Sequence, residues 1–147
     1  MNIFLLGFLL LLCSCVGKNT GPFGISDNNL QPCSKENICL SSSTSLKNKK
    51  DYIEPIKFYE KKSIAYKKLI KILSNYSVQF IAKNPNYIHA RFDSSLLAPQ
   101  RDAEFYFLPN NKVINLKISR GAGWPGFSSS RTLLEEIKFK FFQHDTN

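Results

Sequence analysis

Three segments in the second half of the chain alternate apolar and polar side chains, and this alternation constrains the fold more than any other feature. The segments are 87–92, 103–108 and 112–119. Successive side chains of a strand point to opposite faces of a sheet, so each segment predicts a strand with one apolar and one polar face. The expected apolar face carries Ile88, Ala90, Phe92, Phe105, Phe107, Ile114, Leu116 and Ile118. The expected polar face carries Tyr87, His89, Arg91, Glu104, Tyr106, Asn115 and Lys117.

Short connections predict that these strands pair antiparallel. A fourth strand-like run lies at 78–84, and turn residues stand at 84–86 (Asn-Pro-Asn) and 109–111 (Pro-Asn-Asn). Asn and Pro favour tight turns, and strands joined by tight turns pair antiparallel. An extended piece around 52–59 is a candidate edge strand, since Pro55 is tolerated at an edge.

Two further segments, 63–76 and 127–143, have the apolar period of amphipathic helices. Ser63 is the expected N-cap of the first. We therefore expect a single two-layer α+β domain, with an antiparallel sheet of about four to five strands covered on one face by two helices. For the first helix, packing on the core with a solvated lysine face and direct membrane binding are alternatives. The expected buried positions are Ala65, Leu69, Ile72, Leu73, Tyr76, Leu133, Leu134, Ile137 and Phe141.

The chain opens with a nearly uninterrupted apolar run at 3–12. Ten helical residues span about 15 Å, half the hydrocarbon core of a bilayer, so the run fits a signal peptide and not a transmembrane helix. The residues Leu12-Cys13-Ser14-Cys15 resemble the lipobox of bacterial lipoproteins, in which a small residue precedes the modified cysteine. Ser14 is small and Leu12 is bulky, so the resemblance selects Cys15 and not Cys13. An ordinary secretory signal cleaved near Ser14 is the alternative.

The lipobox resemblance implies that Cys15 carries a diacylglyceryl thioether, that the chain is cleaved before it and that the new amino terminus is acylated. Membrane lipid is then a partner through Cys15, and the expected location is the bacterial cell envelope. Val16 replaces the aspartate that retains some lipoproteins in the inner membrane, which favours the outer membrane. The Gly- and Asn-rich stretch that follows indicates a flexible linker. The expected organisation is a signal peptide at 1–14, the lipidated cysteine and linker at 15–31, and the folded domain at 32–147.

Cys33 and Cys39 lie six residues apart at the start of the expected domain. An exported chain meets an oxidising compartment, so a disulfide is expected and would stabilise the fold by roughly 2–2.5 kcal/mol on the loop-entropy estimate. Free thiols are the alternative. A zinc site lacks ligands, because the only histidines are His89 and His144.

The formal net charge is +9, and the first charged residue is Lys18. A basic surface favours anionic partners, so anionic lipid and other envelope components are candidate partners besides the lipid anchor. Nucleic acid is not expected, because an exported chain rarely meets it and the sequence has no recognition motif.

Several stretches follow one another in the order typical of a known family: Pro-Cys at 32–33, Asn-Ile-Cys-Leu-Ser-Ser at 37–42, Tyr-Ile-His-Ala at 87–90, and Ser119, Arg120, Gly123 and Arg131 in the segment that leads into the last helix. With them the chain resembles the bacterial and plastid family called domain of unknown function 1499, over nearly all of the expected domain. The resemblance implies envelope or lumenal proteins, often signal-bearing or membrane-attached, and no established activity. The sequence departs from the family pattern at Ile38, Arg101, Gly126, Ser128 and Ser130, which removes the acid of the last turn.

The polar sheet face is the best candidate site. His89 with Glu104 suits acid–base chemistry, and Arg91 suits a carboxylate or phosphate. Tyr106 and Arg120 are further candidate ligand-binding residues. Three interpretations remain open: a solvated face where His89 and Glu104 form a cross-strand pair, a non-catalytic binding face, and catalysis. A concave pocket lined by these residues would favour binding or catalysis over a solvated face.

A glycine-rich loop at 121–126 precedes the last helix, between Arg120 and Arg131. Amides at a helix N-terminus can bind an anion, so an anion cradle and a plain strand-to-helix turn are the alternatives. The sequence has no serine elbow, Walker loop or dinucleotide fingerprint, so no catalytic residue, cofactor or metal is expected.

The expected function is that of a membrane-anchored envelope lipoprotein whose small domain binds or supports without catalysis. The alternative is an enzyme, or a protein that binds a small or anionic molecule, using the polar face around His89, Arg91 and Glu104.

Overall fold

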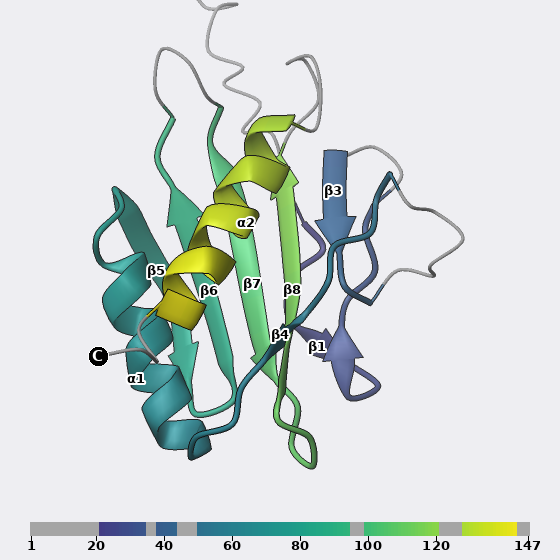
Figure 1. The fold of residues 1–147 in the computed structure, drawn as a ribbon. Helices are drawn as coiled ribbons and strands as arrows, with labels where there is room; N and C mark the ends of the chain where they lie inside the picture. Colours follow the sequence, from purple (N-terminus) through teal and green to yellow (C-terminus); the bar gives the residue numbers. More distant parts are fainter. Residues whose placement is uncertain (1–20, 35–37, 44–49, 95–98, 121–127, 144–147) are drawn as a thin grey trace, which may run out of the picture.

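The computed structural model describes residues 21–34, 38–43, 50–94, 99–120 and 128–143. In this part of the chain, one central sheet carries both helices on a single face (Figure 1). The strand pairs are antiparallel, and one isolated parallel bridge joins Ser41 to Tyr52. The expected α+β class and the two helices are confirmed.

The sheet has six strands, in the order β3-β8-β7-β6-β5 with β4 also paired to β8. The expected total of about four to five strands is wrong. The additional strand is β3, a four-residue segment around Cys39 that is too short to show a clear period and depends on its pairing with β8. The strands are β3 (Ile38–Ser41), β4 (Ile56–Lys57), β5 (Val78–Asn84), β6 (Tyr87–Phe92), β7 (Arg101–Phe107) and β8 (Val113–Arg120).

The two helices are α1 (Lys62–Leu73) and α2 (Ser128–Gln143). The expected N-cap at Ser63 is wrong, because Ser63 lies inside α1. Lys61 holds the N-cap position in an extended conformation, and its side chain makes no capping hydrogen bond. α1 is held on the domain by packing, since its apolar stripe is buried against the sheet.

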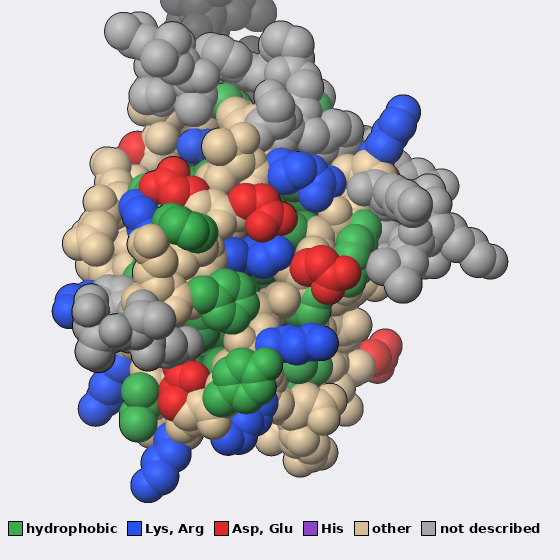
Figure 2. All heavy atoms as spheres, viewed as in Figure 1, with side chains coloured by type: hydrophobic (Ala, Val, Ile, Leu, Met, Phe, Trp, Pro, Cys, Tyr) green, Lys and Arg blue, Asp and Glu red, His purple; other side chains and the backbone are tan. Residues whose placement is uncertain are grey.

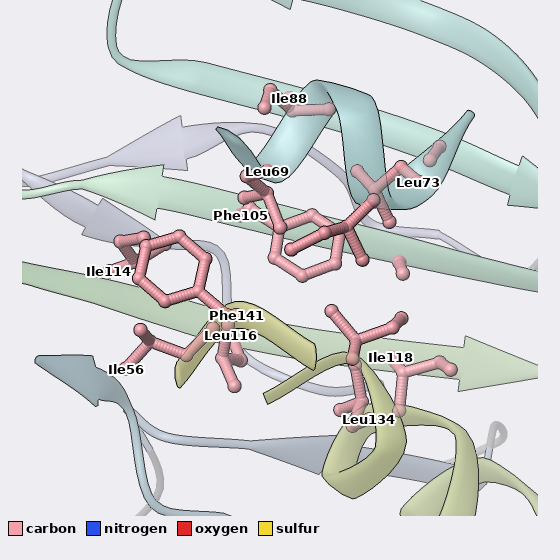
Figure 3. Close-up of a cluster of buried hydrophobic side chains, with 14 of the residues drawn as sticks. Ile56, Leu69, Leu73, Ile88, Phe105, Ile114, Leu116, Ile118, Leu134 and Phe141 are labelled. Carbon is pink, nitrogen blue, oxygen red and sulfur yellow. The ribbon is translucent and has the colours of Figure 1, made fainter. Parts of the chain in front are cut away.

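The hydrophobic core lies between the sheet and the two helices (Figure 3). Leu69 and Leu73 of α1 and Leu134 and Phe141 of α2 are buried among apolar side chains of the sheet. Fully burying one such side chain contributes about 1.5–3 kcal/mol, so this layer supplies most of the stabilisation of the domain. The core side of the sheet is the apolar face that the alternation predicts: Ile88, Ala90, Phe92, Phe105, Phe107, Ile114, Leu116 and Ile118.

Residues 21–34 lie over the other face of the sheet, and we call this segment the cover. It contains a hairpin formed by β1 (Ile25–Ser26) and β2 (Asn29–Leu30). Asp27 and Asn28 have φ values of 51° and 56°, the left-handed pair that a type I′ hairpin turn requires. The part of the expected flexible linker from 21 to 31 is therefore folded structure in contact with β7 and β8.

The disulfide between Cys33 and Cys39 joins the end of the cover to β3. The expected disulfide is thus confirmed, and it fastens the cover to the edge of the sheet. None of the described helices is long and apolar enough to cross a membrane.

Candidate functional site

The face of the sheet under the cover carries two clusters of polar and charged side chains. They come from alternate positions of β6, β7 and β8, which point away from the helices because their neighbours point into the core. Most of these polar side chains are buried, although the sequence alone left a solvated face as one interpretation. The cause of this burial is the cover.

The first cluster is centred on the carboxylate of Asp102. Its Oδ1 atom lies 2.7 Å from Nε2 of His89 and 3.0 Å from Nε of Arg91. His89 and Asp102 are only 4% and 1% exposed, whereas a third of the Arg91 side chain remains accessible. One carboxylate thus holds an imidazole and a guanidinium at the same time.

The second cluster is centred on the carboxylate of Glu104, which is completely buried. Its Oε1 accepts hydrogen bonds from the hydroxyl of Tyr87 at 2.7 Å and from the backbone N–H of Gly24 at 2.6 Å. Its Oε2 lies 2.9 Å from Nζ of Lys117, which also donates to the carbonyl of Pro22. Burial, followed by the hydrogen bond to Glu104, raises the pKa of Tyr87 far above its ordinary value.

The two clusters do not combine in the way expected of an acid–base pair. His89 and Glu104 stand opposite each other in the register of β6 and β7, as expected. Their side chains bond to different partners, however: His89 to Asp102 and Glu104 to Tyr87 and Lys117. Each carboxylate has a cation directly opposite it on the neighbouring strand, Arg91 for Asp102 and Lys117 for Glu104. His89 and Tyr87 reach the same carboxylates as diagonal neighbours, which lie within reach of long side chains.

The cover shields both clusters from solvent and leaves Arg91 partly accessible. The ring of Phe23 lies on His89 with centroids 4.5 Å apart, and Nζ of Lys117 lies 5.6 Å from the same ring. Oδ1 of Asn29 accepts hydrogen bonds from Nδ2 of Asn115 at 2.9 Å and from Oγ of Ser43 at 2.7 Å. Buried charges are tolerated when they are paired and hydrogen-bonded, and the cover supplies part of that bonding.

Tyr106 lies on the same face but in an apolar position, packed with Leu30 and Tyr87. Arg120 does not belong to this face. It follows Ser119, which is paired with Asp102, and shares the helix-covered side with Ile118. It is 1% exposed, and burial lowers its pKa.

The structure separates the remaining candidate, Arg131, from the polar face. Its Nη2 atom donates to the backbone carbonyl of Lys50 at 2.9 Å. The expected anion cradle falls at 121–127, outside the described residues. The structure therefore brings His89, Arg91 and Glu104 to one covered face, with Tyr106 beside them, and places Arg120 and Arg131 elsewhere.

An open cleft of about 610 Å³ lies between the cover and residues 41–43 and 51. Side chains with hydroxyl groups line it, together with two carboxylates and the first cysteine of the disulfide. None of His89, Arg91, Glu104 or Tyr106 lines this cleft. Its lining is Ser26, Asp27, Asn29, Leu30, Pro32, Cys33, Ser34, Ser41, Ser43 and Asp51. Among the described residues, no three His, Cys, Asp or Glu side chains gather so as to hold a metal ion.

The sequence reasoning missed the role of Asp102 and of the cover. Asp102 stands one residue before the apolar-polar alternation of its strand becomes clear, and Arg101 precedes it, so it reads as a strand end. The Asp-Asn pair at 27–28 is a signal that could have found the hairpin, because both residues tolerate positive φ.

The fold and the covered face define a small α+β domain with a closed network of charges. The sequence matches the family model described as "Protein of unknown function (DUF1499)" over residues 29–137. The chain therefore belongs to this family, and the match runs from β2 into α2. No curated protein and no solved structure gives a significant match.

Proposed function

We propose that this protein is a membrane-anchored envelope lipoprotein whose domain binds a polar ligand without catalysing a reaction. The observation that carries the non-catalytic role is the closed charge network. His89, Asp102 and Glu104 are the acid–base groups of the sheet face, and each is buried and bonded to a neighbouring side chain. A general acid or base must reach the proton it transfers, and these groups lie under the cover.

The membrane anchor is the acylated Cys15. The small Ser14 before it and Leu12 three residues before it support acylation at this position. Gly21, the first described residue, lies six positions after Cys15, and six extended residues span at most about 22 Å. The anchor therefore keeps the domain close to the bilayer surface in the cell envelope. Val16, which replaces the aspartate of inner-membrane retention, favours the outer membrane.

The open cleft between the cover and residues 41–43 and 51 is the binding site. Serine hydroxyls, the amide of Asn29 and the carboxylates of Asp27 and Asp51 are suited to a ligand that offers hydroxyl or amino groups. The cleft volume of about 610 Å³ lies within the ordinary range of small-molecule sites. The disulfide holds one wall in place, because Cys33 is part of the lining.

Metabolic labelling with a fatty acid tests the anchor. The wild-type chain and the Cys13→Ala variant are expected to incorporate label, and Cys15→Ala is expected to lose it. Equal labelling of wild type and Cys15→Ala would overturn the lipoprotein assignment.

A nuclear magnetic resonance titration of the full chain tests the cleft, with soluble peptidoglycan fragments as the probe. Amide shifts are expected at Ser41, Ser43 and Asp51, and Asp51→Asn is expected to weaken them. Glu135→Gln, which removes an exposed carboxylate of α2, is the matched control and is expected to leave them unchanged. Shifts confined to the surroundings of His89 and Arg91 would instead support the alternative that the polar face binds the ligand.

A further inference from the structure

A second cavity, of about 320 Å³, lies between the exposed side of α1 and the end of β5. Its apolar part is formed by Tyr66 and Ile70, both of which pack against the core. Its rim consists of Lys67, Lys71 and Lys83. We call this feature the lysine groove.

The three rim lysines differ from other lysines of the domain in their surroundings. On α2, Lys138 and Lys140 make ion pairs with Glu135 and Glu136. Among the described residues, the ion pairs of lysine also include Lys68 and Lys117, and none of them involves a lysine of the groove. Figure 2 shows basic side chains projecting over the α1 side of the molecule, whereas acidic and basic side chains alternate over α2.

This arrangement is not explained by the stability of the fold. Lys67 and Lys71 are four residues apart on one helix, a spacing at which like charges repel. The apolar floor is also left open beside them, and Ile64, one turn before Lys67, is 54% exposed. A ligand with both an anionic group and an apolar portion would neutralise the repelling lysines and also cover the apolar floor.

We propose that the lysine groove is a contact surface for a bilayer that contains anionic phospholipid. The ammonium groups reach the headgroup phosphates, while Ile64, Tyr66 and Ile70 meet the apolar boundary beneath them. Long lysine side chains suit this geometry, because they keep the charge at the headgroup level while their stems lie along apolar surface. The inference rests on the proposed anchor at Cys15, which places the domain near the bilayer. The groove then sets the orientation of the domain on it.

Lysine footprinting tests the groove on the full chain in its acylated form. The protein is reconstituted into vesicles of phosphatidylcholine alone and of phosphatidylcholine with phosphatidylglycerol, and its lysines are acetylated and quantified by mass spectrometry. With phosphatidylglycerol, the labelling rates of Lys67, Lys71 and Lys83 are expected to fall by about five-fold, because each lysine gains about 1 kcal/mol at an anionic surface. High salt is expected to reverse this protection. Equal labelling in both vesicles would overturn the proposal.

Variants separate a local groove from general charge attraction. Lys67→Gln with Lys71→Gln is expected to abolish the protection of Lys83. The matched control, Lys50→Gln with Lys57→Gln, removes the same charge from two exposed lysines outside the groove and is expected to retain it. Loss of protection in both double variants would show attraction by net charge alone and would overturn the groove.

The exposed side chain of Ile64, beside the groove, has its own variant. Ile64→Gln changes no charge and is expected to reduce the protection of Lys67 several-fold. An unchanged protection of Lys67 would overturn the apolar contact through Ile64.

Fatty-acid labelling of Cys15 on the same samples keeps the two proposals distinguishable. Acylation without lysine protection would overturn the groove and leave the anchor. Protection of the lysines in a chain that carries no label would overturn the anchor and leave the groove.

Discussion

The ring of Phe23 lies against the imidazole of His89, with centroids 4.5 Å apart and planes inclined by 40°. Phe23 belongs to the cover, and His89 lies in the middle of the sheet face. This contact turns a face that the alternation marks as polar into an interior. The charged side chains under the cover are consequently expected to contribute to the free energy of unfolding of the domain.

Replacing Phe23 by Ala should loosen the cover. Because Phe23 is partly buried, we expect a loss of about 1–3 kcal/mol in the free energy of unfolding, below the range for a fully buried aromatic. Urea denaturation measures this loss. Modification of His89 by diethyl pyrocarbonate should also become faster. Phe139→Ala, at a phenylalanine of α2 that is 61% exposed, is the control and should change neither quantity. Equal modification of His89 in both variants would contradict a covering role for Phe23.

The pair Glu104–Lys117 should show strong coupling. Glu104→Gln leaves the buried ammonium of Lys117 without its carboxylate, and breaking such a pair costs about 3–5 kcal/mol. Lys117→Met should cost a similar amount, and the double variant should cost less than the sum. Chemical denaturation of the four chains gives the coupling energy. For comparison, Glu136→Gln breaks the exposed pair with Lys140 and should cost below about 1 kcal/mol. Additive losses at Glu104 and Lys117 would refute the coupling.

Removing the disulfide should weaken both the fold and the cover. Cys33→Ser with Cys39→Ser should lose roughly 2–2.5 kcal/mol, since the small loop is no longer closed in the unfolded chain. Reduced wild-type protein should match this variant in thermal denaturation. Because the disulfide fastens the cover to β3, His89 should also react faster. A double serine variant as stable as the oxidised protein would speak against this role.

Tyr87 should make the domain sensitive to alkali. Its pKa is raised in the folded protein, chiefly by burial and then by Glu104. The folded state therefore disfavours the phenolate. The stabilisation is complete below the ordinary tyrosine pKa of about 10 and is lost as the pH rises above it. Tyr87→Phe should show a shallower fall of unfolding free energy above about pH 10, measured by urea denaturation at several pH values. The exposed Tyr59→Phe control should keep the steeper wild-type dependence. Identical slopes in all three chains would disprove the assignment to Tyr87.

Much of the domain follows from local pattern. The strands β5, β6, β7 and β8 and the buried stripes of α1 and α2 appear where alternation and helical period predict them. These segments are long enough for several repeats of their period, so the pattern is clear without tertiary information. Shorter elements do not have this advantage. β3 spans four residues and β4 only two, and each exists through its pairing with β8.

The candidate site was only half predictable. The alternation placed His89, Arg91 and Glu104 on one face, and the register put His89 opposite Glu104. The alternation did not predict the hydrogen bond between His89 and Asp102. A diagonal contact depends on side-chain length and on which segment lies above the sheet.

The sequence by itself determined which side chains share each face of the sheet, which segments form the long strands and helices, and which two cysteines in the described domain are close enough along the chain to pair. These properties depend on neighbours a few residues apart. Only the tertiary structure decided that the polar face is closed. The hydrogen bond from Gly24 to Glu104 joins residues 80 positions apart, and a pattern of neighbouring residues cannot predict a contact over that separation. Burial of a polar face depends on which distant segment lies over it, and that is settled when the whole chain packs.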